Sequence, residues 1–163
     1  EPVGQRRRAL GIDFSGGLFG LGFWFEGNYN WMEREGDFLR FVSGFDYTLK
    51  NGLYMVFEGM FNGRAEAGPP YPALDWLEYI YFGEPVARDR FVFGLRDELM
   101  DLVDWSLFCF AGTDGSMVFS PRIDADIAQN ADLVLFAAVT VGREEGQFPP
   151  GSYGLTARVT VSF

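Results

Sequence analysis

The chain has 163 residues, a formal net charge of −10 at pH 7, no histidine and a single cysteine, Cys109. Non-specific nucleic-acid binding relies on clustered Lys and Arg, so this acidic balance argues against a nucleic-acid partner. The lack of histidine removes Ser–His and Cys–His nucleophilic machinery, and one cysteine provides neither an intrachain disulfide nor a thiolate metal site.

Aromatic residues and glycine are both abundant, with 18 Phe, 7 Tyr, 4 Trp and 21 Gly. This combination is typical of short strands joined by tight turns, because Gly is unfavourable inside helices. No stretch of the sequence approaches about 18 consecutive apolar residues, so a transmembrane helix is not expected.

Alternation of apolar and polar residues predicts four strands in the first part of the chain. Their expected ranges are 8–15, 19–31, 39–49 and 53–62. We expect the first turn at Gly16-Gly17, the second in the charged stretch 33–37, and the third at Lys50-Asn51-Gly52, which carries a hairpin signal.

The long segment 63–87 interrupts this pattern with four prolines. Its aromatic and acidic centre, residues 74–82, is compatible with a short helix or with an extra strand. Loops of this length are usually functional or disordered. Within it, Asp75, Trp76, Glu78 and Tyr79 are the residues that we expect to form a constriction or an external face.

Five further strands are predicted at 90–96, 103–110, 117–127, 133–142 and 153–163. The expected connections are 97–101, 112–116, 129–131 and the polar loop 143–152. Pro121 has no N–H to donate, so it predicts a bulge or a local edge inside its strand.

The last strand, Y-G-L-T-A-R-V-T-V-S-F, alternates without a break and ends on an aromatic residue. It resembles the closing strand of bacterial outer-membrane β-barrels, and residues 46–58 and 117–142 resemble hairpins of porin-like members. The resemblance implies an all-β, antiparallel up-and-down transmembrane β-barrel in the bacterial outer membrane. It also implies membrane lipid and the barrel-assembly machinery as partners, with an assembly signal at Tyr153, Val161 and Phe163.

The expected connections are short at one end of the strands and longer at the other, which is the pattern of such barrels. The total of nine strands is odd, whereas bacterial single-chain barrels normally have an even number. We therefore expect residues 1–163 to be one barrel domain that forms the C-terminal sector of a larger barrel, completed by a preceding part or by oligomer partners. Two alternatives are one bent strand over 9–31, which makes eight, and an added strand at 74–82, which makes ten.

Charged residues of both signs recur on the polar side of the predicted strands. In a narrow barrel they would pair and fill the lumen, whereas in a wide one they would line water and set a weak preference for cations. The lumen-lining candidates are Asp13, Glu26, Arg40, Asp46, Glu58, Arg96, Asp104, Arg122, Asp124, Asp126 and Arg158.

Aromatic residues gather near the strand ends on the apolar side, where interfacial girdles lie in membrane barrels. They are Tyr29, Trp31, Tyr47, Phe61, Trp105, Tyr153 and Phe163.

No enzyme, metal or cofactor is expected. Asp124 with Asp126, and Glu144 with Glu145, are formal carboxylate pairs, but solvated charges are the commoner reason for such pairs. The leading functional prediction is passive or weakly selective passage of small hydrophilic solutes. The alternatives are a non-conducting scaffold barrel that binds through its loops, and a soluble lipocalin-like carrier of apolar ligands.

Overall fold

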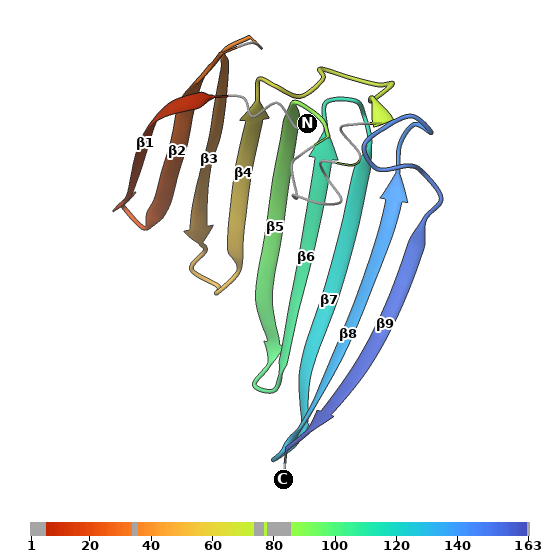
Figure 1. Ribbon diagram of the computed structural model, residues 1–163. Coiled ribbons are helices and arrows are strands. Elements are labelled where there is room, and N and C mark those ends of the chain that lie inside the picture. The colour runs from red at the N-terminus through yellow and green to blue at the C-terminus, as the bar shows by residue number, and fades with distance from the viewer. Residues whose placement is uncertain (1–5, 34–35, 74–76, 78–85, 163) are drawn as a thin grey trace.

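The computed structural model describes residues 6–33, 36–73, 77 and 86–162. Its strands form a single antiparallel sheet in sequential order (Figure 1). They are β1 (Arg7–Leu18), β2 (Leu21–Met32), β3 (Phe38–Thr48), β4 (Tyr54–Asn62), β5 (Asp89–Met100), β6 (Val103–Gly112), β7 (Met117–Ala128), β8 (Ala131–Val141) and β9 (Tyr153–Val161).

The prediction of nine strands in an up-and-down arrangement is confirmed for the described residues. The predicted closure into a barrel is not seen, because β1 pairs only with β2 and β9 pairs only with β8 among these strands. The eight-strand alternative is wrong, since residues 9–31 divide into β1 and β2. The ten-strand alternative rests on residues 74–82, nearly all of which lie outside the described residues.

The predicted turn at Gly16-Gly17 is wrong, because both glycines lie inside β1, opposite Phe23 and Gly22. The chain reverses instead at Phe19-Gly20, which joins the paired residues Leu18 and Leu21. Phe19 and Gly20 have φ angles of 53° and 84°. Positive φ at both central residues is typical of type I′ turns, whose twist matches that of the flanking strands.

Replacing Phe19 by Asn is expected to stabilise this turn by up to about 1 kcal/mol, because Asn tolerates positive φ far better than Phe. The Phe19 side chain is 94% exposed, so its removal costs little packing. Urea unfolding of the refolded protein would measure the gain. Phe14→Asn, a change of the same type within β1, should destabilise the sheet.

Two other predicted connections differ from the structure in detail. β5 continues through residues 97–100, and a two-residue turn at 101–102 leads to β6, after a register irregularity between Glu98 and Met100. At Pro121, the pairing of β7 with β8 is interrupted between Phe119 and Arg122, and the register is the same on both sides of the interruption. Because proline has no N–H to donate, the ladder with β8 is interrupted there as the local-edge alternative predicts, and the register shows no bulge at that point.

The two longest connections lie at one end of the sheet, and the three two-residue turns lie at the other (Figure 1). Residues 19–20, 49–53, 101–102 and 129–130 connect strands at one end, here named the short-turn end. Residues 33–37, 63–88, 113–116 and 142–152 connect them at the other, the long-loop end. The predicted sorting is therefore present in the fold.

Few hydrophobic side chains are buried in the part of the chain that the structure describes: Phe38, Tyr71, Val86, Ala87 and Ala131. A globular domain normally buries most of its large aliphatic and aromatic residues in one contiguous core. The sheet is instead held by its strand ladders and by cross-strand contacts of side chains on each face.

Two glycines permit close packing of rings against the backbone. Gly44 lies beneath the ring of Trp24, and a Cβ at Gly44 would also lie 2.7 Å from the carbonyl oxygen of Phe57. Gly94 lies in the same way beneath Phe108. Any larger residue at either position would push the ring or a strand aside. No helix among the described residues is long and apolar enough to cross a membrane.

Candidate functional site

All eleven lumen-lining candidates lie on one face of the sheet, here named the polar face. The strand register establishes this, since Asp13 lies opposite Glu26, and Asp104 lies opposite Asp124. The register adds four charged residues that sequence reasoning left out: Arg7, Arg90, Glu98 and Asp132. Each lies near an end of its strand. Arg7, Glu98 and Asp132 lie just beyond the bounds of the predicted strands, and Arg90 is the first residue of the predicted strand 90–96.

Charged residues of β5, β6 and β7 form two adjacent rows across the polar face. Glu98, Asp104 and Asp124 are directly opposite one another in one row. Arg96 and Arg122 flank Ser106 in the next row. These two rows together are named the charged ladder, and all of their charged residues except Glu98 line a hollow of ≈ 440 Å³.

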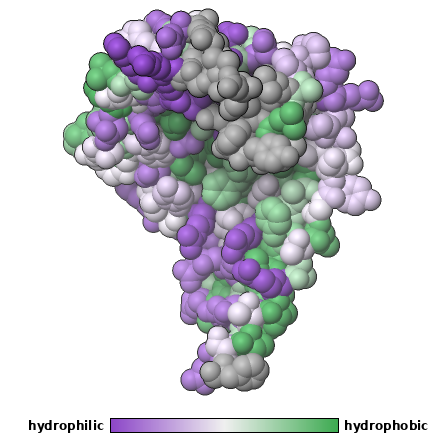
Figure 2. Space-filling model, in the orientation of Figure 1, coloured by the Kyte–Doolittle hydropathy of each residue, from purple (hydrophilic) through white to green (hydrophobic). Residues whose placement is uncertain are grey.

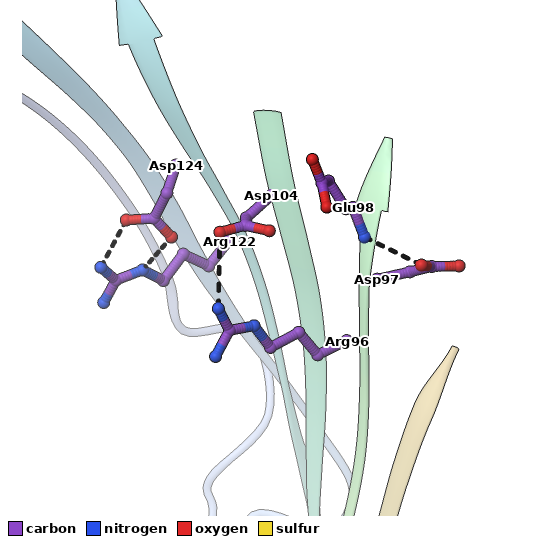
Figure 3. Close-up of polar contacts among 6 residues, drawn as sticks. All are labelled: Arg96, Asp97, Glu98, Asp104, Arg122 and Asp124. Atoms are coloured by element: carbon purple, nitrogen blue, oxygen red, sulfur yellow. Dashed lines mark hydrogen bonds and ion pairs between the residues drawn. The ribbon is translucent and has the colours of Figure 1, made fainter. Parts of the chain in front are cut away.

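Ion pairs connect the two rows of the charged ladder (Figure 3). The guanidinium of Arg122 donates to both carboxylate oxygens of Asp124, at 2.5 and 2.6 Å. Arg96 lies 3.4 Å from an oxygen of Asp104. The paired side chains are between 37% and 64% exposed. Exposed pairs of this kind contribute about 0–1 kcal/mol each, so the ladder's main physical effect is the local field it creates rather than stability.

Acidic residues on β1–β4 have fewer cationic neighbours. Asp13 and Glu26 are direct cross-strand neighbours, an arrangement that is unfavourable for like charges in a sheet. The indole N–H of Trp24 donates to Glu58 at 3.2 Å. This part of the polar face therefore carries a net negative charge.

At the long-loop end, Phe38 lies between two arginines of the polar face. The guanidinium carbons of Arg7 and Arg40 are 5.8 and 5.7 Å from the centroid of its ring. Arg7 also donates to the side-chain carbonyl of Asn30 at 2.7 Å. Asn30 is fully buried, so these contacts fix the outer ends of β1, β2 and β3 to one another.

Asp114 joins three connections at the long-loop end. Its carboxylate accepts hydrogen bonds from the hydroxyl of Tyr71 at 2.8 Å, from the backbone N–H of Gln147 at 2.7 Å, and from the N–H and hydroxyl of Ser116. The hydroxyl of Ser116 accepts in turn from the N–H of Phe148 at 3.1 Å. We name these residues the Asp114 cluster.

The Asp114 cluster shifts the pKa values of its two titratable groups in opposite directions. Burial opposes ionisation of Asp114, but hydrogen bonds from Ser116, Gln147 and Tyr71 outweigh it and lower the pKa of the carboxyl. Burial, the hydrogen bond to Asp114 and its negative charge all raise the pKa of the Tyr71 hydroxyl. At neutral pH the cluster therefore consists of a charged acceptor and a neutral donor.

The opposite face of the sheet, the apolar face, carries rows of stacked rings. Phe14, Phe25, Phe41 and Phe61 follow one another across β1–β4, with centroids 5.4, 6.0 and 5.3 Å apart. A second row joins Phe45, Phe57 and Phe91 at 5.5 and 6.1 Å. These side chains are partly exposed although they are large and hydrophobic. Figure 2 shows hydrophobic residues beside hydrophilic ones along the narrowing end of the sheet.

The girdle aromatics lie on the apolar face close to the strand ends. Tyr29, Trp31, Phe61 and Tyr153 are at the long-loop end, and Tyr47 and Trp105 are nearer the short-turn end. Tyr153 and Val161, predicted as parts of an assembly signal, are the first and last residues of β9. Phe163 and the constriction candidates Asp75, Trp76, Glu78 and Tyr79 lie outside the described residues.

The two formal carboxylate pairs lie in different parts of the fold, one on a strand and the other in a connection. Asp124 and Asp126 share the polar face, and Arg122 engages Asp124. Glu144 and Glu145 are in the exposed connection before β9. Among the described residues, no three His, Cys, Asp or Glu side chains are grouped so as to hold a metal ion.

No protein-family model, curated protein or solved structure matches this chain. The strand topology and the two faces are therefore the features on which a functional proposal can rest.

Proposed function

We propose that this sheet is a sector of a transmembrane β-barrel in a bacterial outer membrane, and that small hydrophilic solutes pass along its polar face. The observation that carries the proposal is the exposure of the apolar face. Phe45, Phe93 and Val139, from three different strands, are 48%, 43% and 43% exposed. Soluble monomers rarely expose contiguous apolar patches of more than a few hundred Å².

The separation of charged and apolar residues onto opposite faces of the sheet supports a position in a membrane rather than in water. Lipid contact would cover the apolar face, while the charged ladder would face water inside a barrel. The aromatic residues near both ends of the strands fit interfacial girdles. A lipocalin-like carrier would instead turn its apolar face inward around a ligand and its polar face outward, and the exposure of large rings along the apolar face argues against it.

The open edges support a larger barrel. β1 and β9 run in the same direction, because they are separated by an even number of antiparallel steps. Direct pairing of β1 with β9 would be parallel, whereas bacterial barrels are antiparallel throughout. An odd number of additional strands between β9 and β1 satisfies both edges. Lipid cannot hydrogen-bond the free backbone groups of either edge, so closure is required in a membrane.

The second candidate, a non-conducting barrel that binds a partner through its loops, is favoured by one observation. The Asp114 cluster fixes the connections 63–88, 113–116 and 142–152 to one another at one end of the sheet. An ordered rim of this kind suits recognition as well as it suits passage.

Recording from planar bilayers that contain the intact full-length protein tests the two candidates. The passage proposal requires discrete single-channel currents with a modest preference for cations. Correctly inserted protein without current would contradict passage and leave the binding barrel. Protein that stays folded and monomeric in buffer without detergent would contradict both.

Neutralising Asp13 and Glu26 together, as Asp13→Asn and Glu26→Gln, should lower the cation-to-anion permeability ratio by about fourfold. A unit charge about 8 Å from an ion contributes about 0.5 kcal/mol in a water-like dielectric, which is about a twofold change for each charge. Reversal potentials under a salt gradient measure the ratio. Glu144→Gln, in an exposed connection, is the matched control and should leave the ratio close to that of the unmodified protein. An unchanged ratio in the double variant would contradict a path along β1 and β2.

A further inference from the structure

Two arginines lie beside an aromatic pair at the long-loop end of β1 and β2. Arg8 is directly opposite Trp31 in the register, and Trp31 meets Tyr29 edge-to-face with centroids 4.9 Å apart. Arg8 shares its side of β1 with Leu10, so it lies on the apolar face. Among the described strand residues it is the only basic residue on that face, since the other strand arginines are on the polar face.

The arginines border a hollow at the rim of the apolar face. It measures ≈ 260 Å³ and is lined by Arg6, Arg8, Trp31, Met32 and Glu33. Both arginines are exposed, and neither guanidinium has a hydrogen bond or an ion pair with any residue that the structure describes. The site therefore holds two cations whose guanidinium donors are not used by the residues that the structure describes.

Two described carboxylates near the hollow, Glu33 and Asp37, have other partners. Glu33 accepts from the backbone N–H of Arg6 at 3.4 Å, and its own N–H donates to the Arg6 carbonyl at 3.2 Å. Asp37 accepts from the Met32 N–H at 3.0 Å and from the Tyr29 hydroxyl at 3.3 Å. These contacts hold both carboxylates close to the backbone and to Tyr29, and neither forms an ion pair with Arg6 or Arg8.

We propose that this hollow, named the rim site, binds the phosphate of an anionic membrane lipid. Guanidinium groups bind phosphate oxygens in a two-pronged geometry, and two of them outweigh the one carboxylate among the described lining residues. Trp31 provides an apolar wall at the place where the apolar face ends. An acyl chain leaving the phosphate would continue over Tyr29 and Leu10, which are 40% and 68% exposed. A free phosphate ion would leave this apolar wall unused, so the lipid is the better fit.

The inference rests on the proposed membrane function. If the sheet is inserted in a bilayer, the rim site is level with the headgroups, as expected for aromatic and basic residues that end a lipid-facing surface. Lipid would then contribute specific charge contacts at one edge of the barrel sector in addition to solvating its apolar face.

Quenching of tryptophan fluorescence by brominated lipids tests the rim site in the intact full-length protein. The Trp31 signal is the difference between the unmodified protein and Trp31→Phe. We expect brominated phosphatidylglycerol to quench this signal at lower mole fraction than brominated phosphatidylcholine. The double variant Arg6→Gln with Arg8→Gln should lose the preference, by about fivefold for each arginine. Arg143→Gln, at an exposed position of the same end, should keep it.

Each remaining outcome has a definite meaning. If the double variant retains the preference for phosphatidylglycerol, the rim site is overturned. If inorganic phosphate at millimolar concentration abolishes the preference, the ligand is free phosphate and the assignment to lipid is overturned. Protease protection and far-ultraviolet circular dichroism report insertion separately. Protein that does not insert overturns the membrane proposal and the rim site together, whereas inserted protein without lipid preference overturns the rim site alone.

Discussion

Phe93→Arg is expected to destabilise the protein in lipid by about 2–4 kcal/mol, which is the cost of placing arginine at the lipid-facing midplane of a transmembrane barrel. Phe93 lies in the inner part of β5 on the apolar face, opposite Phe57 and Cys109. Its side chain is 43% exposed. In water the same change would replace an exposed ring by a solvated charge and cost far less, so the size of the effect distinguishes the two settings.

Val92→Arg is the matched control for Phe93→Arg. Val92 is the neighbouring residue on the same strand, but it lies on the polar face opposite Glu58. An arginine there would meet a carboxylate and water, so a loss of less than about 1 kcal/mol is expected. Reversible urea unfolding of the full-length protein in phospholipid vesicles measures both variants. Equal losses, or a larger loss for Val92→Arg, would contradict lipid contact at the apolar face.

The strands and their two faces were predictable because one physical pattern repeats along the chain. In β2, Phe23 and Phe25 alternate with Trp24 and Glu26, and the register pairs like faces with like across neighbouring strands. A slip of one residue would move every side chain to the wrong face, so the pattern fixes the register once strands are paired. The alternation pattern therefore placed the eleven candidates on the face of the sheet where they lie.

The turn between β1 and β2 was not predictable from local preferences. Gly16-Gly17 is a stronger turn signal than Phe19-Gly20, since aromatic residues seldom adopt positive φ. In the structure the two glycines lie within the ladder, and β1 has three residue pairs beyond the predicted strand end at Ser15 before it ends at Leu18. The ladder hydrogen bonds and the packing of Phe23 over Gly16 offset the unfavourable conformation of one exposed Phe.

The Asp114 cluster was missed for a different reason. Sequence reasoning identified residues 112–116 as a turn, which is correct locally. The long-range partners of Asp114 are Tyr71 and Gln147, which are 43 and 33 residues away. Nothing in the alternation pattern indicates that a tyrosine in a proline-rich connection would reach this carboxylate. Long-range contacts among connections depend on how the sheet brings their ends together.

Asp114→Asn is expected to release the connection that contains Tyr71 from the long-loop end. The carboxylate accepts four hydrogen bonds from the surrounding groups. A neutral amide would present its NH2 group to donors, and the hydrogen bonds that remain would lose their charge. Hydrogen bonds to charged groups contribute about 1.5–3 kcal/mol each, and a buried donor left unsatisfied costs a similar amount. We expect amide exchange at Gln147, Phe148 and Ser116 to accelerate by at least about tenfold.

The pH dependence provides an independent check on Asp114. The pKa of Asp114 is lowered in the folded protein. Its stabilisation of the contacts among the three connections is therefore complete above the unfolded value near 3.8, and it is lost as the pH falls through the lowered folded value. The contribution of the Tyr71 hydroxyl changes at alkaline pH instead. Because its pKa is raised in the folded protein, its contribution is complete below about pH 10 and is lost as the pH rises through the folded value. The contacts of Asp114 with Tyr71 and Gln147 should therefore be equally stable at all pH values between about 3.8 and about 10.

Asp101→Asn is the matched control for Asp114→Asn, because Asp101 is exposed in the turn at the opposite end of the sheet. It should leave amide exchange at Gln147, Phe148 and Ser116 close to that of the unmodified protein. Tyr71→Phe removes one donor and leaves the other three hydrogen bonds to Asp114, so it should accelerate exchange less than Asp114→Asn does. If Asp114→Asn leaves exchange at these amides unchanged, the carboxylate does not hold the connections together, and an ordered rim formed by the Asp114 cluster is contradicted.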